Sequence, residues 1–458
     1  MIQNTRIKLL NQKNVQNREF VLYWMQSSQR TYFNHALEYS IQISNKLNKF
    51  LKVCFVLNKN YPEAQNRHFL FMLEGLYEVQ KELAQRKIQM TLEIGIPSKI
   101  IKKFSQKSCL VVTDRGYTKT INSWKKEVGI KIDCRLVQVE TEAIVPIEEV
   151  SNKEEYGAYT IRPKIKKLLG NYLHPLNPSD IKKKDTTGNS FESLKKTKHI
   201  IDNLKSVSTL PRKDFFKGGS HAAKTELKRF LETKAKNYSL DKNNPSLDAL
   251  SNMSPYLHFG QISPIEITLE VLKKEISDET KESYLEELII RRELSFNFVF
   301  FNKSYDNFDC LPKWCKDTLM KHKKDKRNHI YSLEELELAK THDPYWNAAQ
   351  KEMIIKGKMH GYMRMYWGKK IIEWTKDPEV AFCNTLYLNN KYQLDGRDPN
   401  SYSGVAWCYG KHDRPWKERN IFGKIRYMNE NGLRRKFDIE TYVNKTEILY
   451  ANLSFNKK

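Results

Sequence analysis

The residues with the clearest chemical potential lie near the C-terminal end of the chain, where aromatic, basic and turn-forming side chains alternate. Two tryptophans there, Trp407 and Trp416, are interleaved with basic residues that include Arg414 and Arg426. An indole ring beside a guanidinium group can stack on an unpaired base while the cation binds the neighbouring phosphate. The turn sequence DGRDPN, residues 395–400, exposes backbone amides and carboxylates to a ligand. The segment therefore indicates a nucleic-acid surface next to a ligand site.

Three tryptophans further upstream could form a path for an electron. Trp367 and Trp374 are seven residues apart, so on a helix they share a face and lie roughly 10 Å apart along its axis. Trp346 belongs to a neighbouring element. Rigid indole rings at short separations can pass an electron between a buried redox group and the surface. Core packing is the alternative interpretation, because buried tryptophans are common in protein interiors.

A further ligand signal lies in the sequence DALSNMSPYLHFGQIS, residues 248–263. Ser251, Asn252 and Ser254 come just before or next to Pro255, and this pattern is typical of the start of a helix. Hydroxyl and amide groups at a helix N-terminus can bind a phosphate group. Taken alone, the pattern fits an ordinary helix cap better.

The overall charge narrows the kind of partner. The 458 residues carry a net charge of +25, which favours a polyanion such as DNA. A generally basic proteome is the competing explanation for the same charge. With 40% hydrophobic and 12% aromatic residues, the chain is able to build two globular domains.

The cysteines, the histidines and the N-terminus argue against several other classes of protein. The seven cysteines are scattered without a CxxC pair, which favours free thiols in a reducing compartment over disulfides or a zinc site. The eleven histidines have no useful metal-ligand spacing, so we expect no metal. We see no apolar signal region and no run of membrane-spanning length. We expect a soluble, intracellular monomer without membrane contact, in the cytoplasm or nucleoid of a prokaryote or the nucleus of a eukaryote.

The elements that must position these residues fall into two parts, of which the first alternates strands and helices. Between about Phe20 and Val150, five short apolar runs predict buried strands: FVLYWM, LKVCFVL, IQMTLEIG, SCLVVTD and CRLVQVE. Residues 32–47 and 65–86 have helical spacing. This alternation predicts a Rossmann-like α/β domain with a parallel sheet and ligands at the carboxyl ends of its strands. No GxGxxG loop for a dinucleotide is present.

The second part of the chain has a helical pattern throughout. Its clearest helical segments are 224–238, 264–276, 282–301 and 332–340. Between the two parts, the polar sequence IKKKDTTGNS lacks periodicity and is expected in a linker that crosses the surface. We therefore predict an α/β domain at residues 1–150, an interdomain linker at 151–212 and an all-α domain at 213–458.

These segments together resemble the class II cyclobutane pyrimidine dimer photolyases of the photolyase and cryptochrome superfamily. The resemblance rests on HGYMRMYWGKKIIEW and the Trp- and Arg-rich segment after it, on SNMSPYLHFGQIS, and on YWMQSSQR, VVTDRGY and YTIRPKI in the first half. It covers nearly the whole chain and is weakest in the N-terminal third. It implies an α/β antenna domain followed by an all-α FAD-binding domain. It also implies light-dependent repair, in which an electron passes from excited, reduced FAD to a pyrimidine dimer flipped out of double-stranded DNA, and then returns.

For the flavin, the resemblance implies a set of contacts from the helical domain. Arg364 and Asp395 match the ion pair beside the flavin ring, where a cation stabilises the reduced anionic form. Asn389 matches the asparagine whose amide faces flavin N5. The complete set implied for FAD is Tyr238, Ser251, Asn252, Met253, Ser254, Arg364, Asn389, Asp395 and Gly396.

The resemblance also orders the three tryptophans as an electron-transfer triad. In the matching pattern Trp367 is nearest the flavin, Trp346 is intermediate and Trp374 lies at the surface. The triad reduces oxidised flavin in light, whereas the repair step does not require it. Its loss is expected to abolish photoreduction and to spare repair after chemical reduction.

The lesion pocket implied by the resemblance combines aromatic, apolar and acidic groups. The catalytic set implied is Glu287, Met365, Asn389 and Trp407. Desolvation in a closed pocket would protonate Glu287, which could then donate a hydrogen bond to the thymine carbonyls. The DNA contacts implied are Trp407, Arg414, Trp416 and Arg426. A loop with Arg-Pro-Trp combines a cation with an apolar wedge that can enter the gap left by base flipping.

The resemblance leaves the second chromophore and one substitution open. A light-harvesting cofactor in the antenna domain would be a deazaflavin or a folate. Lys242 stands where the family usually has arginine, and lysine lacks the planar fork for a two-pronged contact. The alternative functions are a cryptochrome-like blue-light photoreceptor without repair activity and repair of the (6-4) photoproduct. The short sequence after Tyr427 argues against the first, and the scarcity of histidines beside His412 argues against the second.

Overall fold

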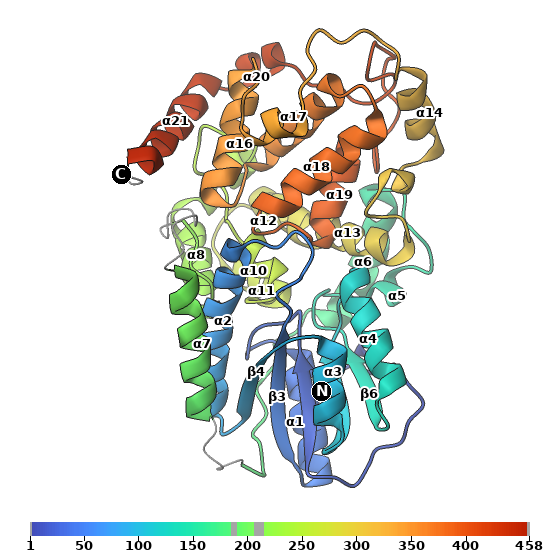
Figure 1. Ribbon diagram of the computed structural model, residues 1–458, viewed down its shortest axis with the longest axis vertical. Helices are drawn as coiled ribbons and strands as arrows, with labels where there is room; N and C mark the ends of the chain where they lie inside the picture. Colours follow the sequence, from blue (N-terminus) through green and yellow to red (C-terminus); the bar gives the residue numbers. More distant parts are fainter. Residues whose placement is uncertain (1, 185–189, 206–214, 456–458) are drawn as a thin grey trace.

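The computed structural model describes residues 2–184, 190–205 and 215–455. Figure 1 shows a sheet at the lower end of the molecule, with the helices of the second half of the chain stacked above it. The six strands of the sheet are β1 (Ile7–Leu9), β2 (Phe20–Met25), β3 (Phe50–Leu57), β4 (Gln89–Ile94), β5 (Ser108–Asp114) and β6 (Arg135–Val139). The predicted order, an α/β part followed by a helical part, is confirmed.

The helices of the first half alternate with the strands, and further helices follow the last strand. They are η1 (Asn4–Arg6, a 3-10 turn), α1 (His35–Leu47), α2 (Asn66–Gln85), α3 (Pro97–Ser105), α4 (Lys119–Lys131), α5 (Ile147–Val150), α6 (Ala158–Tyr172) and α7 (Ser190–Lys205). The two predicted helices, α1 and α2, are confirmed. The sequence pattern missed α3 and α4, since their many lysines dilute the apolar periodicity.

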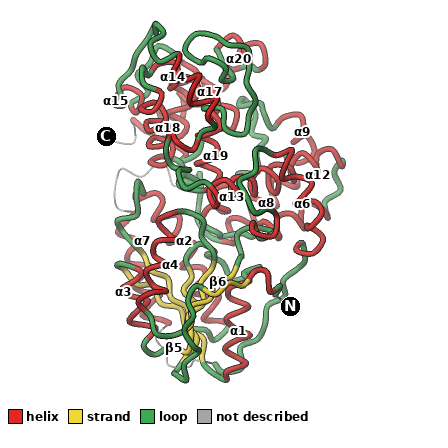
Figure 2. The backbone as a smooth tube through the Cα atoms, turned by 90° about the vertical axis from the view of Figure 1, so that its right-hand side faces the viewer, coloured by secondary structure: helices red, strands yellow, loops and turns green. Residues whose placement is uncertain are grey.

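The second half is helical, as predicted, and Figure 2 shows its labelled helices in the part of the molecule above the strands. The elements up to the π-helix are α8 (Ser220–Thr233), η2 (Ala235–Asn237), α9 (Tyr238–Asp241), α10 (Ser254–His258), α11 (Pro264–Lys273), α12 (Asp278–Leu285) and the π-helix η3 (Glu286–Arg291). The remaining elements are α13 (Arg292–Phe301), η4 (Phe308–Cys310), α14 (Lys313–Lys321), α15 (Leu333–Glu337), α16 (Pro344–Lys356), α17 (Gly361–Trp374), α18 (Pro378–Tyr392), α19 (Pro399–Cys408), α20 (Glu430–Lys436) and α21 (Ile439–Phe455).

The sheet has the order β1-β6-β5-β2-β3-β4, with β2 to β6 parallel and β1 antiparallel to β6. All five predicted strands are confirmed. The edge strand β1 was not predicted, because its three residues are largely exposed and form no apolar run. The connections run to opposite sides of β2, first to β3 and later to β5. This reversal creates a crevice at the carboxyl ends of β2 and β5, where α/β proteins bind ligands.

The alternation of side chains along β2 explains how the sheet is covered on both faces. Val21 and Tyr23 pack in the same apolar cluster as residues of α1 and α2. Leu22 and Trp24 point the other way, into a cluster with Trp124 of α4. Successive strand residues face opposite sides of a sheet, so a strand buried on both faces appears in the sequence as a continuous apolar run.

The region predicted as a linker contains two helices. The helix α6 lies within it, and α7 packs against α2 and β4 of the sheet domain. Residues 185–189 and 206–212, which include part of the sequence IKKKDTTGNS, lie outside the described residues. The extent of the linker therefore stays a prediction.

The two parts of the chain share one apolar core rather than meeting only through polar contacts. Phe71 of α2 packs against Tyr256 and Phe259 at ring-centroid distances of 5.2 and 5.3 Å. A separate apolar cluster fills the helical part and includes Trp346 and Trp367.

In the three described ranges of the chain, no helix combines the length and apolar composition needed to cross a membrane.

Candidate functional site

A cavity of about 670 Å³ lies among α9, α10, α12, η3, α17 and α19 of the helical part. Its volume is in the range of cavities that enclose a cofactor or a drug-sized ligand. Eleven of the residues that the sequence assigned to flavin, lesion or DNA line this one space: Tyr238, Ser251, Asn252, Met253, Ser254, Glu287, Arg364, Met365, Asp395, Trp407 and Arg426. Segments nearly two hundred residues apart therefore meet at a single site.

Arg364 and Asp395 form a close ion pair on the wall of this cavity. One terminal nitrogen of Arg364 donates to both carboxylate oxygens of Asp395, at 2.9 and 2.8 Å. The Asp395 side chain is only 8% exposed, and its burial by itself would raise its pKa. The charge of Arg364 outweighs burial and holds the pKa of Asp395 below its usual value. The carboxylate is therefore ionised, and it fixes the guanidinium at the cavity wall.

Lys358 adds a second cation that the sequence analysis missed. It lines the cavity, and its Nζ donates to Asn252 Oδ1 at 2.7 Å. Burial lowers the pKa of Lys358 to about 8, and the charge of Asp395 opposes that shift. Asn252 itself has a left-handed backbone with φ of 58°, a conformation asparagine tolerates better than most residues. Nothing in the local pattern distinguishes Lys358 among the 79 lysines and arginines of the chain.

Two residues assigned to the flavin do not line the cavity. The buried amide of Asn389 donates to Ser401 Oγ, and Ser401 is the residue that faces the space. Gly396 lies in the turn after Asp395, where a side chain would come within 2.9 Å of Asn390 Cα. Gly396 therefore shapes the turn that presents Asp395. The assignment of Asn389 to flavin N5 stays a prediction.

The three tryptophans form a continuous row of rings. Trp346 and Trp367 are nearly parallel, at 9° and a centroid distance of 6.2 Å. Trp346 and Trp374 meet edge to face at 5.5 Å. Trp367 lies three residues after Arg364 on α17, which places both on one side of that helix. The structure therefore brings together the three residues assigned to electron transfer, next to an element of the cavity wall.

The expected surface position of Trp374 is wrong. Its relative exposure is 2%, because Tyr331 and His342 cover its ring at centroid distances of 5.2 and 5.4 Å. His342 is exposed, and Tyr331 OH lies 2.6 Å from His342 Nδ1. The row of tryptophans thus ends beneath an aromatic layer.

Glu287 lies in more open surroundings than the closed pocket that the resemblance implies. It lies on the π-helix η3, a local irregularity that often marks a functional site. Its side chain is 51% exposed, and its carboxylate pairs with Lys242 Nζ at 3.2 Å. The carboxylate therefore faces open space in this structure, and its hydrogen bond to the thymine carbonyls stays a prediction. Lys242, the residue that departs from the family pattern, serves as the partner of this carboxylate.

The aromatic and basic residues assigned to DNA lie together at the cavity mouth. Trp407 and Arg426 line the cavity, whereas Arg414 and the 40% exposed Trp416 lie outside it. The Arg426 guanidinium is within 5.9 Å of the Trp407 ring centre and 5.0 Å of the Trp416 ring centre. Arg414 approaches Trp416 at 5.5 Å. Cations close to indole rings form a flat and positively charged surface here, and its contact with DNA stays a prediction.

His412 is a further lining residue with unusual geometry. Its φ of 61° is left-handed, which is uncommon outside glycine and costs energy. Burial lowers its pKa to about 4, so the ring is neutral at physiological pH. Its Nδ1 donates to the backbone oxygen of Tyr156 at 2.8 Å. The sequence analysis noted His412 only as the histidine close to the pocket segments and did not predict that it lines the cavity.

His322 anchors the loop that carries Arg414 and Trp416. This imidazole lies between two carboxylates, with Nδ1 2.6 Å from Asp325 and Nε2 3.0 Å from Glu418. Lys321 also pairs with Glu418 at 2.8 Å, and the backbone of Ile421 donates to Asp325 at 2.8 Å. The end of α14 is thereby joined to the loop before α20. Burial lowers the pKa of His322, but the two carboxylates outweigh burial and raise it overall.

Replacing His322 by glutamine should give a pH-dependent loss of stability. A raised folded-state pKa means that the stabilisation is fully present below the unfolded value, near 6.5, and disappears as the pH rises through the folded value. We expect wild type to exceed His322→Gln by roughly 1 kcal/mol below pH 6.5, with the difference shrinking above it. Urea unfolding at several pH values measures this difference. A difference that grew with pH would contradict the anchoring role of the protonated ring.

A second, smaller cavity of about 110 Å³ lies at the sheet crevice. Residues after three strands line it, including Ser27 and Gln29 after β2, Asn58 after β3 and Tyr117 after β5. The Oγ of Ser27 and the Oε1 of Gln29 are buried without a hydrogen-bond partner in the described part of the chain. Buried polar atoms are normally paired, so these atoms fit a polar ligand at the crevice.

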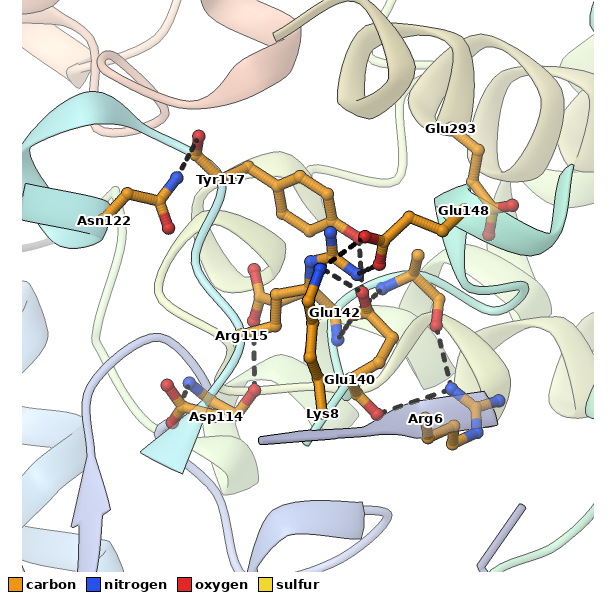
Figure 3. Close-up of polar contacts among 12 residues, drawn as sticks. Arg6, Lys8, Asp114, Arg115, Tyr117, Asn122, Glu140, Glu142, Glu148 and Glu293 are labelled. Carbon is orange, nitrogen blue, oxygen red and sulfur yellow. Dashed lines mark hydrogen bonds and ion pairs between the residues drawn. The ribbon is translucent and has the colours of Figure 1, made fainter. Parts of the chain in front are cut away.

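Figure 3 shows a polar network that fixes Tyr117 and the segment after β6. The Tyr117 hydroxyl donates to Glu140, whose other oxygen accepts from the backbone of Glu142 at 2.8 Å. Arg115 pairs with Glu148 at 2.7 Å. Burial raises the pKa of Glu142, another lining residue, to about 8. The small cavity therefore has a rigid, hydrogen-bonded wall.

In the described ranges, no three Cys, His, Asp or Glu side chains cluster to hold a metal ion.

Known proteins resemble this chain along nearly its whole length. The DNA photolyase family model matches residues 21–180. A deoxyribodipyrimidine photo-lyase from Methanothermobacter thermautotrophicus is 47% identical, covering 97% of this chain and 98% of that protein. One from Arabidopsis thaliana is 41% identical, with coverages of 94% and 89%.

Solved structures with low sequence identity have the same fold. A class III photolyase from Agrobacterium tumefaciens has a TM-score of 0.71 at 16% identity, covering 94% of this chain and 87% of that chain. An archaeal photolyase from Sulfolobus tokodaii, solved with two FAD molecules, has a TM-score of 0.70 at 15% identity, with coverages of 94% and 92%. At such identities the likeness concerns the fold alone.

Proposed function

The chain belongs to the DNA photolyase family, and on this premise we propose that it is a class II enzyme that splits cyclobutane pyrimidine dimers in DNA with light. Family membership rests on relatives up to 47% identical over almost the full length. One cavity is lined both by the Arg364–Asp395 pair and by Trp407 with Arg426, and this observation carries the proposal. A redox cofactor and a flipped-out pair of adjacent, covalently joined pyrimidines would therefore meet in one cavity.

The cavity suits FAD in its reduced, anionic form. Arg364 and Lys358 provide positive charge on the wall, and Asp395 orients Arg364. The hydroxyls of Ser251 and Ser254 line the same space and could donate to a diphosphate. FAD would supply the absorption of light and the electron for the dimer. The chain itself binds, orients and shields the reacting partners.

The lesion side of the cavity is proposed to hold the dimer by stacking and charge. Trp407 and Met365 provide the aromatic and apolar walls, and Glu287 provides the polar partner of the pyrimidine ring. Arg414, Trp416 and Arg426 would occupy and grip the gap that remains in the duplex. Because phosphate contacts dominate such binding, affinity should fall steeply with salt.

The row of Trp367, Trp346 and Trp374 is proposed to deliver electrons that reduce the oxidised flavin. The rings are stacked or in edge contact, and Trp367 Nε1 is held by Gln350 at 2.9 Å. Fixed rings at short separations keep the path intact without motion of the backbone.

The α/β part, predicted at residues 1–150, is proposed to be the antenna domain. The small cavity at the carboxyl ends of β2, β3 and β5 is the place where it would hold a second chromophore. The unpartnered Ser27 and Gln29 oxygens support a polar group there. A deazaflavin and a folate both carry such groups, so the choice between them stays open.

A repair assay tests the proposal directly. The purified protein would be reduced and illuminated with an oligonucleotide duplex that contains one thymine dimer, with a dark control. We expect flavin absorbance and light-dependent recovery of intact thymines. Bound flavin without repair would instead favour a photoreceptor of the cryptochrome type. Repair of a (6-4) photoproduct but not of the dimer would overturn the substrate assignment, and absence of flavin would overturn the cofactor assignment.

A further inference from the structure

Two exposed tyrosines lie side by side at the start of α6. Tyr156 and Tyr159 are 44% and 65% exposed, and their ring centroids are 6.1 Å apart at an interplanar angle of 60°. Single exposed aromatics are ordinary on a protein surface. An adjacent pair, however, offers flat apolar area of the kind that stacks on nucleobases.

Two hydrogen bonds tie Tyr156, one member of this pair, to the loop that is proposed to enter DNA. The Tyr156 hydroxyl donates to the backbone oxygen of Asp413 at 2.8 Å, and His412 Nδ1 donates to the backbone oxygen of Tyr156 at 2.8 Å. The next residue along the loop is Arg414, which stacks on Trp416. The tyrosines therefore continue the aromatic and basic surface at the cavity mouth.

The helix behind the tyrosines is basic and adjoins the cavity wall. The sequence of α6 holds four lysines and arginines and no acidic residue. Arg162 of α6 pairs with Glu286 at 2.7 Å, and Glu286 directly precedes the lining residue Glu287 on η3. Lys166 and Lys167 are exposed. A stacking surface backed by positive charge complements a polyanion better than it complements a neutral or basic protein partner.

We propose that Tyr156 and Tyr159 stack on a base of the undamaged strand, at the position that loses its partner when the dimer leaves the duplex. This inference rests on the proposed function, because only a flipped lesion creates such orphaned bases. The cavity is proposed to accept the dimer of the damaged strand, and neither tyrosine is among the residues that line it. Aromatic faces accept any base, so the contact would not depend on the sequence opposite the lesion.

The affinity of Tyr159→Ala for three DNA molecules tests the inference. They are a duplex with one thymine dimer, the same damaged strand alone, and a duplex with abasic sites opposite the dimer. Loss of one base–aromatic stack should weaken binding to the first by about 5- to 100-fold. Binding to the other two should be the same as that of the parent protein, because neither offers a base to stack. Tyr159→Trp should restore duplex binding, which a merely structural role for the tyrosine would not predict.

A control and the contrary outcomes are available in the same experiment. Tyr32→Ala removes a similarly exposed ring, 47% accessible, from the α/β part and should change none of the affinities. Equal losses on duplex and single strand would overturn the inference, since the contact would then involve the damaged strand. An unchanged affinity for the damaged duplex would also overturn it. If the parent protein did not prefer dimer-containing DNA, the proposed function itself would fail, and that result is visible before any variant is compared.

Discussion

Trp367→Phe is expected to leave the bound flavin oxidised under light that reduces the flavin of the parent protein. Trp367 stacks on Trp346 at 6.2 Å and belongs to the same helix as Arg364, so it is the ring through which the row reaches the cavity wall. Phenylalanine keeps an aromatic ring, smaller than indole, that is much harder to oxidise. The visible absorbance of the flavin during illumination measures the effect. After chemical reduction, the variant should repair dimers at the rate of the parent protein.

A matched variant separates electron transfer from general packing. Trp314 of α14 is half-buried against the same apolar cluster but has no ring contact with the three tryptophans. Trp314→Phe should therefore photoreduce normally. Loss of repair in chemically reduced Trp367→Phe would contradict the assignment, because it would show that the ring supports the site itself. Normal photoreduction in Trp367→Phe would exclude this row as the electron path.

The architecture was accessible from the sequence because each strand of the sheet is a short apolar run. β2, for example, is buried at all six residues and has no polar position to obscure it. The edge strand β1 and the lysine-rich α4 were not predicted, because their exposed residues outnumber their buried ones. The π-helix η3 was not predicted either, since a π turn inside an apolar helix does not change the amino-acid composition.

The residues of the site were predicted from the resemblance to a known family. The structure shows that residues far apart in the chain come together through the packing of the helices. Tyr238 and Trp407 are far apart in sequence and line one cavity, which no local pattern could show. Lys358 was not predicted as a cation of the cavity wall, because this role follows from its burial beside Asp395 and not from its neighbours in the chain. Tyr331 and His342 cover Trp374 only because the folded chain places them against its ring, although they precede it by more than thirty residues. Sequence spacing could place Trp374 on a helix face but could not reveal what covers that face.

Arg364→Leu should abolish flavin binding and also destabilise the protein. The substitution leaves the buried Asp395 carboxylate without its partner, and breaking a buried pair in this way costs about 3–5 kcal/mol. It also removes the cation proposed to stabilise the anionic ring. Flavin content would be measured by absorbance and the free energy of unfolding by urea titration. A comparable pair away from the cavity, Arg86 with Glu38 at 3.0 Å, provides the control. Arg86→Leu should lose stability but keep its flavin.

The double variant Arg364→Leu with Asp395→Leu distinguishes the two roles of this pair. Replacing both charges by apolar side chains is often neutral, so most of the lost stability should return, to within about 2 kcal/mol of the parent protein. Flavin binding should stay lost, since the positive charge at the cavity wall is still missing. Recovery of flavin together with stability would show that the pair serves the fold alone. In that case Lys358, the other cation on the wall, would have to supply the charge that orients the cofactor.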